Sequence, residues 1–135
     1  MTASTTRSSA LAAVGPVQAD DATLVEVRLL VADGVRRAGR GAIELELVGD
    51  ELAVAEAELI WLVTTNKGWA HMRGEATLAD GRRLPFRADL YDASQARDPG
   101  PDRIALRIYA AGDDPNRSSP IRKLGGSMAP GSIVM

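Results

Sequence analysis

Both tryptophans and the only histidine of the chain lie in one short stretch, WLVTTNKGWAHMRG, at residues 61–74. A tryptophan beside an arginine can hold a sugar ring or a protein partner through stacking and cation–π contacts. Trp61, His71 and Arg73 are therefore the candidate ligand-binding residues. Burial of Trp61 is the alternative, because residues 59–63 are apolar without a break and strands buried on both faces lose their alternation.

A second group of candidate residues is acidic and lies in the stretch ADLYDASQARDPGPD. Asp89, Asp92, Asp98 and Asp102 are its four aspartates, and carboxylates in a loop are the ligands that calcium prefers. Their spacing does not follow the EF-hand pattern, and aspartate and proline are common in turns. Ordinary turns are the favoured interpretation, and a calcium site is the alternative.

The sequence argues against several classes of function. There is no cysteine, His71 is the sole histidine, and no G-x-S-x-G motif is present, so we predict a protein that is not an enzyme and needs no cofactor. The net charge of −2 and the absence of an aromatic-lined basic strand argue against nucleic acid as a partner. No apolar run approaches the roughly 20 residues that span a bilayer.

Hydrophobic residues recur with a period of two along most of the chain, which is typical of strands. The segments that alternate or carry strand-forming residues are TLVEVRLLV, GAIELELVG, ELIWLVTT, WAHMRGEATLA, RRLPFRADLYD, RIALRIYA and GSIVM. Turn-forming residues separate them, so we predict an all-β fold, an antiparallel β-sandwich of about seven to nine short strands, Ig-like or jelly-roll-like. The stretch DELAVAEAELI has helix propensity, but we predict that it is a strand.

The pattern of faces also predicts the register of two hairpins. Three-residue loops at 66–68 and 79–81 keep one face of each hairpin apolar, whereas a two-residue loop at 80–81 would set apolar residues against charged ones. Met72 is then opposite both Leu62 and Ala88, and Trp61 is opposite Arg73. The predicted core face consists of Ile60, Leu62, Met72, Leu78, Leu84, Phe86 and Leu90.

The N-terminus differs in composition from the rest of the chain. We predict that residues 1–21 form a disordered tail or a degraded signal segment, with Ala19 at the place where a signal peptidase would cleave. Residues 22–135 form a single domain. The C-terminal GSIVM could act as an unpaired edge strand that pairs between chains.

The order WLVTTNKGWAHMRGEATLADGRRLPFRADLYD, then PDRIALRIYAAGDD, then GSIVM resembles a recurring module of large secreted bacterial surface proteins. It is similar to the C-terminal or inter-domain β-sandwiches found among PKD-like and cadherin-like repeats. The resemblance implies a non-catalytic structural or adhesion module, extracellular or at the cell surface, with a protein or glycan partner. The alternative is a calcium- or carbohydrate-binding protein that uses the aspartate loops or Trp61.

Overall fold

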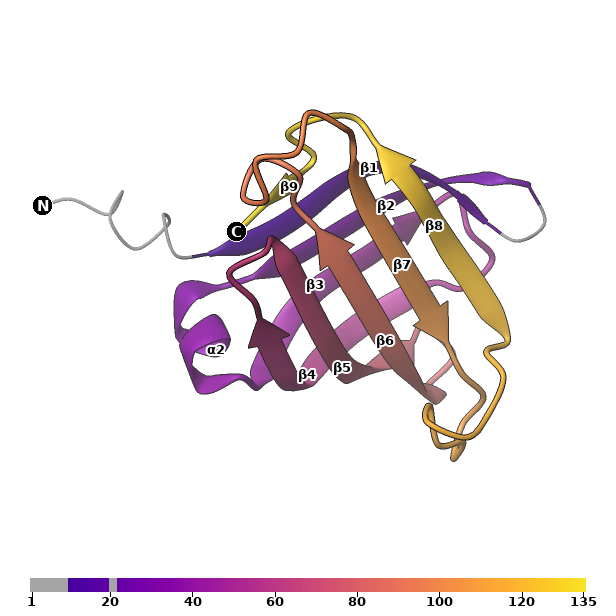
Figure 1. Cartoon of the computed structure of the whole chain (residues 1–135). Helices are drawn as coiled ribbons and strands as arrows, with labels where there is room; N and C mark the ends of the chain where they lie inside the picture. Colours follow the sequence, from indigo (N-terminus) through magenta and orange to yellow (C-terminus); the bar gives the residue numbers. More distant parts are fainter. Residues whose placement is uncertain (1–9, 20–21) are drawn as a thin grey trace, which may run out of the picture.

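A computed structural model describes residues 10–19 and 22–135 of the chain. This part of the chain contains nine strands and one short helix (Figure 1). In chain order they are β1 (Leu11–Ala19), β2 (Leu24–Val31), α2 (Asp33–Ala38), β3 (Gly41–Val48), β4 (Val54–Thr64), β5 (Trp69–Leu78), β6 (Arg83–Tyr91), β7 (Asp102–Ile108), β8 (Arg122–Met128) and β9 (Ile133–Val134).

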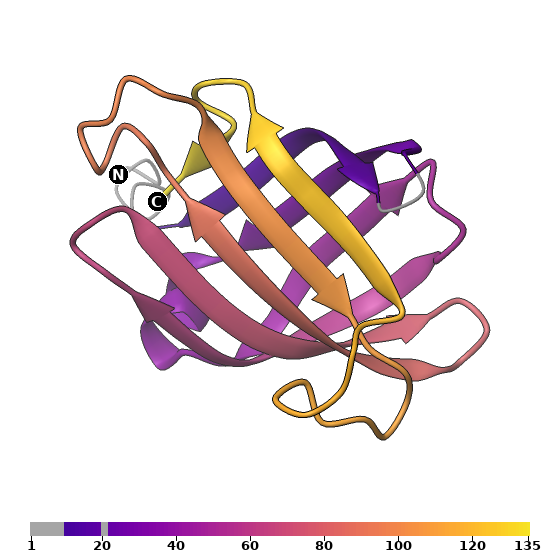
Figure 2. The ribbon, with the colours of Figure 1, turned by 45° about the vertical axis from the view of Figure 1, so that its right-hand side comes forward.

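The strands form a closed antiparallel barrel. From β2 to β8 each strand pairs with the next one in sequence, and β1 closes the ring by pairing with both β2 and β8. Figure 2 shows β5–β8 as the near wall and β1–β3 as the far wall. The all-β class is therefore confirmed, but the predicted sandwich is not what forms, because β1 joins the two ends of the sheet. Closure leaves few unpaired sheet edges, which is an advantage of barrels.

The N-terminal strand corrects the prediction of a tail over residues 1–21. Residues 11–19 form β1, which alternates between buried and outward-facing positions and pairs along its length with β2. Leu11 and Ala13 are fully buried. Residues 1–9 and 20–21 lie outside the described part of the chain. Cleavage after Ala19 would remove a strand that closes the barrel.

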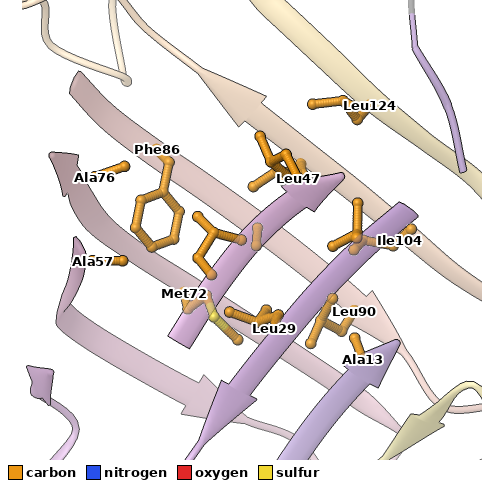
Figure 3. Packing of buried hydrophobic residues seen from close by; sticks show 14 of the residues in the cluster. Ala13, Leu29, Leu47, Ala57, Met72, Ala76, Phe86, Leu90, Ile104 and Leu124 are labelled. Carbon is orange, nitrogen blue, oxygen red and sulfur yellow. The ribbon is translucent and has the colours of Figure 1, made fainter. Parts of the chain in front are cut away.

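The interior is filled by aliphatic side chains that point inward from all sides of the barrel (Figure 3). Phe86 is fully buried and packs over Gly74 on the neighbouring strand. A Cβ atom at Gly74 would lie 2.7 Å from the Phe86 ring and 2.2 Å from the carbonyl oxygen of Glu58. Glycine at position 74 is thus required by the close approach of these two groups.

The predicted registers of the two hairpins agree with the structure. Met72 is opposite Ala88 in the β5–β6 hairpin and opposite Leu62 in the β4–β5 hairpin. Trp61 is opposite Arg73, as expected. The residues of the predicted core that are buried are Met72, Leu78, Leu84, Phe86 and Leu90.

One member of the predicted core faces the wrong way. Ile60 is 45% exposed, whereas its neighbour Leu59 is buried and occupies the position opposite Gly74. The β4–β5 register shifts between Leu59 and Trp61, so Ile60 is the extra residue of a β-bulge. The prediction placed Ile60 in the core because it assumed strict alternation of inward and outward side chains through the apolar run. Leu62 is partly buried against the core cluster.

Three elements complete the barrel in ways that alternation alone does not reveal. Strand β8 contains two consecutive glycines and has little apolar character, and α2 is a six-residue helix between β2 and β3. The C-terminal β9 pairs with β1 of the same chain, with Ala13 opposite Ile133. In the described part of the chain, no helix has the length and apolar character needed to cross a membrane.

Candidate outer-face site

The four candidate calcium ligands are occupied by protein donors. Asp92 accepts hydrogen bonds from Ser94, and buried Asp102 accepts bonds of 2.9 Å from the backbone N–H groups of Ala93 and Ile133. These contacts tie the β6–β7 connection to β9. In the described ranges 10–19 and 22–135, no group of three or more histidine or acidic side chains is close enough to hold a metal ion.

Asp98 plays a similar structural role in the same connection. Its carboxylate accepts hydrogen bonds of 2.7 Å from the backbone N–H of Gly100 and from the hydroxyl of Tyr91. These two donors lower the pKa of Asp98, the Gly100 N–H having the larger effect. The same contact with Asp98 raises the pKa of Tyr91. Asp89, the fourth candidate, lies outside this loop and belongs to a different cluster.

We expect Asp98→Ala to lower the pKa of Tyr91 towards the ordinary phenol value of about 10. The bond to Asp98 stabilises the neutral phenol, so its contribution to stability is present below pH 10 and is lost as the pH rises through the raised pKa of Tyr91. Absorbance titration in a Tyr109→Phe background would isolate Tyr91, since the chain has two tyrosines. An unchanged titration midpoint in Asp98→Ala would show that the hydrogen bond is absent in solution.

Trp61, His71 and Arg73, the candidate ligand-binding residues, all lie on the outer face of the β4–β5 hairpin. Trp61 is 36% exposed, so the fold does not bury it. His71 is opposite Val63, and its ring is stacked on Trp69 at a centroid distance of 5.6 Å. The structure therefore groups His71 with Trp69 of the same strand.

An acid–base cluster surrounds Asp89 on this outer face. Its carboxylate lies 2.7 Å from Nδ1 of His71 and 3.2 Å from a guanidinium nitrogen of Arg107, and Nε of Arg87 is 3.9 Å away. The Asp89 side chain is only 17% exposed. The carboxylate is thus within hydrogen-bond distance of His71 and Arg107, whereas buried Nε of Arg87 is near enough only for a charge contact.

Aromatic side chains form a second row beside this cluster. Trp69 lies opposite Tyr91 with ring centroids 4.8 Å apart, and the guanidinium of Arg103 sits 5.2 Å from the centre of the Tyr91 ring. Ser127 continues this row on β8, opposite Arg103. The row therefore crosses β5, β6, β7 and β8 in register.

A row of cationic residues runs parallel to the aromatic one. Arg73 is opposite Arg87, Arg87 is opposite Arg107, and Arg107 is opposite Lys123. Like charges directly opposite one another on a sheet are destabilising. Asp89 and Asp114 approach this cation row to within 4.0 Å, and Lys123 has no ion-pair partner among the residues that the structure describes. The cation row therefore keeps an excess of positive charge.

Small residues separate the two rows on β7 and β8. Ala105 is opposite Gly125, and a Cβ at Gly125 would lie 2.3 Å from the carbonyl oxygen of Ile104. A hollow of about 250 Å³ opens between Trp69 and Ser127, and another of about 370 Å³ lies beside Lys123. Ala105 lines both hollows. This arrangement, hereafter the outer-face site, consists of two hollows that meet at Ala105. Trp69, Arg103 and Ser127 are among the residues that line one, and Arg107 and Lys123 are among those that line the other.

Ser127, the serine of the outer-face site, lies far from His71 in the described part of the chain. Ser127 lines the hollow, but it lies on β8, three strands away from His71 on β5. Strands are about 4.8 Å apart, so these two residues are separated by roughly 14 Å. Ser127 therefore does not make the contact with the His71–Asp89 pair that nucleophilic catalysis needs.

Comparisons with known proteins add nothing to this geometry. No family model, curated protein or solved structure matches the chain. The resemblance to modules of bacterial surface proteins stays a prediction.

Sequence reasoning overlooked most of this site. It selected Trp61 rather than Trp69, and it assigned no role in ligand binding to Tyr91, Arg103 or Arg107. The signal was present in the predicted hairpin register, because placing Met72 opposite Ala88 also places His71 opposite Asp89 and Trp69 opposite Tyr91.

Proposed function

We propose that this chain is a non-catalytic binding module whose outer-face site takes a six-membered ring that carries an anionic group. The observation that supports the proposal is the register of an aromatic row and a cationic row across β5–β8. Between these rows lie His71 and Asp89 on β5 and β6, and the small residues Ala105 and Gly125 on β7 and β8. Trp69 provides a surface for the ring, and Arg107 and Lys123 provide the charge for the anion. Small residues leave room for the ligand against the backbone.

The spacing of the rows sets the dimensions of the ligand. Trp69 and His71 are two residues apart on β5, as are Arg103 and Ala105 on β7, and two residues of a strand span roughly 6.7 Å. The aromatic and cationic rows are separated by twice that distance at the backbone. Arg103 extends to Tyr91 and Arg107 extends to Asp89, both on β6, which leaves the backbone at Ala105 and Gly125 open. An oligosaccharide of two or three units, or a fused aromatic acid, therefore fits between the rows.

A uronic-acid oligosaccharide is the ligand that combines these features with the expected glycan partner. Its pyranose rings have apolar faces that stack on tryptophan, and its carboxylates match the bidentate geometry of arginine. Asp89 and Arg103 line the hollow and can bond to ring hydroxyls. Such binding suits an adhesion role, and it is compatible with the predicted extracellular or cell-surface location.

We expect Arg107→Gln to weaken binding of trigalacturonate by about 10- to 100-fold, because a charge-assisted hydrogen bond contributes roughly 1.5–3 kcal/mol. Isothermal titration calorimetry of the full chain measures this change. Arg28→Gln on β2 is the matched control, since it removes the same charge from an exposed position on another part of the barrel. It is expected to leave the affinity unchanged.

Two further ligands test whether the site needs an anionic group and whether that group belongs to a sugar or to an aromatic acid. The methyl ester of trigalacturonate should bind much more weakly than the acid, and 2-naphthoate tests whether a free aromatic acid fills the same site. Stronger binding of 2-naphthoate would assign the site to aromatic acids rather than to glycans. Absence of binding by both acids, or equal losses in Arg107→Gln and Arg28→Gln, would contradict the proposed site.

A further inference from the structure

Strand β4 extends beyond its neighbour on one side. It pairs with β3 only through residues 57–59, whereas its pairing with β5 continues to Thr64. Residues 60–64 therefore have β5 on one side and no strand of the described chain on the other. We call this segment the free edge.

The free edge begins at the bulge of Ile60 and is otherwise largely apolar and exposed. Ile60, Trp61 and Val63 are 45%, 36% and 52% exposed. Residues 59–66 contain no charged residue and no proline. Exposed apolar edges without charge or proline pair readily with other strands, so proteins generally cover or interrupt them.

The hairpin hydrogen bonds identify the backbone groups that face outward. The N–H of Thr65 donates to the carbonyl oxygen of Trp69 at 2.9 Å. The backbone N–H and C=O groups of successive residues in an antiparallel strand point alternately to the two neighbouring strands. The backbone groups of Val63 therefore point to β5, like those of Thr65. The backbone groups of Leu62 and Thr64 point to the open side. These are the groups that a further strand would bind.

We propose that the free edge pairs antiparallel with the free edge of a second copy of this chain. A two-fold axis at Leu62 sets Leu62 opposite its own copy and Trp61 opposite Val63 of the second copy. An aromatic residue opposite a β-branched one is among the favourable cross-strand pairs. An isologous contact of this kind is closed, so it produces a dimer rather than a filament.

Charges at the ends of the free edge favour a second copy as the occupant. The symmetric pairing brings the turn at residues 66–68 of one copy to the place where β3 begins in the other. A hollow of about 500 Å³ lies there, and Arg40 and Glu58 are among its lining residues. Lys67 in the arriving turn complements Glu58, and the two-fold axis forms this contact twice. Arg40 can donate to the carbonyl oxygens of the same turn.

Sedimentation equilibrium of the full chain tests this proposal. We expect a concentration-dependent mass between that of the 14.3 kDa chain and twice that value at concentrations up to about 1 mM. Thr64→Pro removes an outward-facing N–H and is tolerated at an edge, so it should leave only the monomer. A wild-type chain that stays monomeric, or a Thr64→Pro variant that dimerises normally, would overturn the proposal.

Charge exchange gives a second test that does not depend on proline. Glu58→Lys and Lys67→Glu should each weaken dimerisation by about fivefold or more, and the double variant should restore it. Glu46→Lys, which changes an exposed charge on β3 away from the free edge, is the matched control. Failure of the double variant to recover would contradict the symmetric pairing. These results do not depend on the ligand of the outer-face site.

Discussion

Replacing Arg122 by methionine is expected to lower the free energy of unfolding by about 3–5 kcal/mol, because it leaves a buried carboxylate without its partner. The partner is Asp50, whose side chain is fully buried while that of Arg122 is 8% exposed. Nε of Arg122 donates to Asp50 at 2.9 Å, and a second guanidinium nitrogen contacts the same oxygen. The pair links the start of β8 to the β3–β4 connection, 72 residues away in sequence.

Urea denaturation at neutral pH measures this loss. The double variant Asp50→Leu with Arg122→Met removes both charges, so we expect it to be clearly more stable than Arg122→Met alone. Arg117→Met is a suitable control, because the Arg117 side chain is 87% exposed. A loss below about 1 kcal/mol in Arg122→Met, the range of exposed ion pairs, would show that the pair is hydrated in solution.

Replacing Phe86 by alanine is the second change with a large expected effect. Phe86 is the only phenylalanine, is fully buried, and fills the space above Gly74 in the barrel. We expect a loss of about 3–5 kcal/mol, since truncation removes the buried ring and leaves a cavity that the surrounding strands cannot close completely.

Chemical denaturation of Phe86→Ala can be compared with Val63→Ala on the free edge. Val63 is 52% exposed, so its truncation should change the free energy of unfolding of the monomer by no more than about 0.5 kcal/mol. Equal effects of the two substitutions would mean that Phe86 does not occupy the barrel interior.

The local β-structure could be predicted from the sequence because register is set by alternation. A one-residue slip moves every side chain to the other face, so the apolar face of β5 and β6 determines the pairing of Met72 with Ala88. The orientation of Ile60 was predicted wrongly because the β-bulge lies in an apolar run, where the sequence shows no change of polarity at the bulge. Leu59 and Ile60 are equally acceptable in either position as far as hydrophobicity is concerned.

Closure of the barrel could not be read from alternation. A sheet that closes and two sheets that pack face to face both require strands with one apolar side. The decision rests with β1 and β8, whose pairing joins Gln18 to Gly125 across more than a hundred residues of sequence. Both strands are rich in small residues, so their alternation of apolar and polar residues is weak. For this reason β1 was predicted to be a tail, and β8 was not predicted as a strand.

The outer-face site was predictable only in part. His71 and Asp89 were both selected, but as members of separate sites, since their proximity requires the β5–β6 register to be applied to the polar face. The cation row depends on the positions of β7 and β8 as well. Those positions follow from tertiary pairing, which a pattern within single strands does not specify.

The measurement that tests the binding account most directly is a ¹⁵N–¹H NMR titration of the full chain with trigalacturonate. The account predicts that the largest shifts appear at the indole N–H of Trp69 and at the amides of Ala105 and Gly125. Arg107→Gln should need a higher ligand concentration to reach the same shifts. A titration without shifts, or with its largest shifts on β2–β4, would contradict the outer-face site as the binding surface.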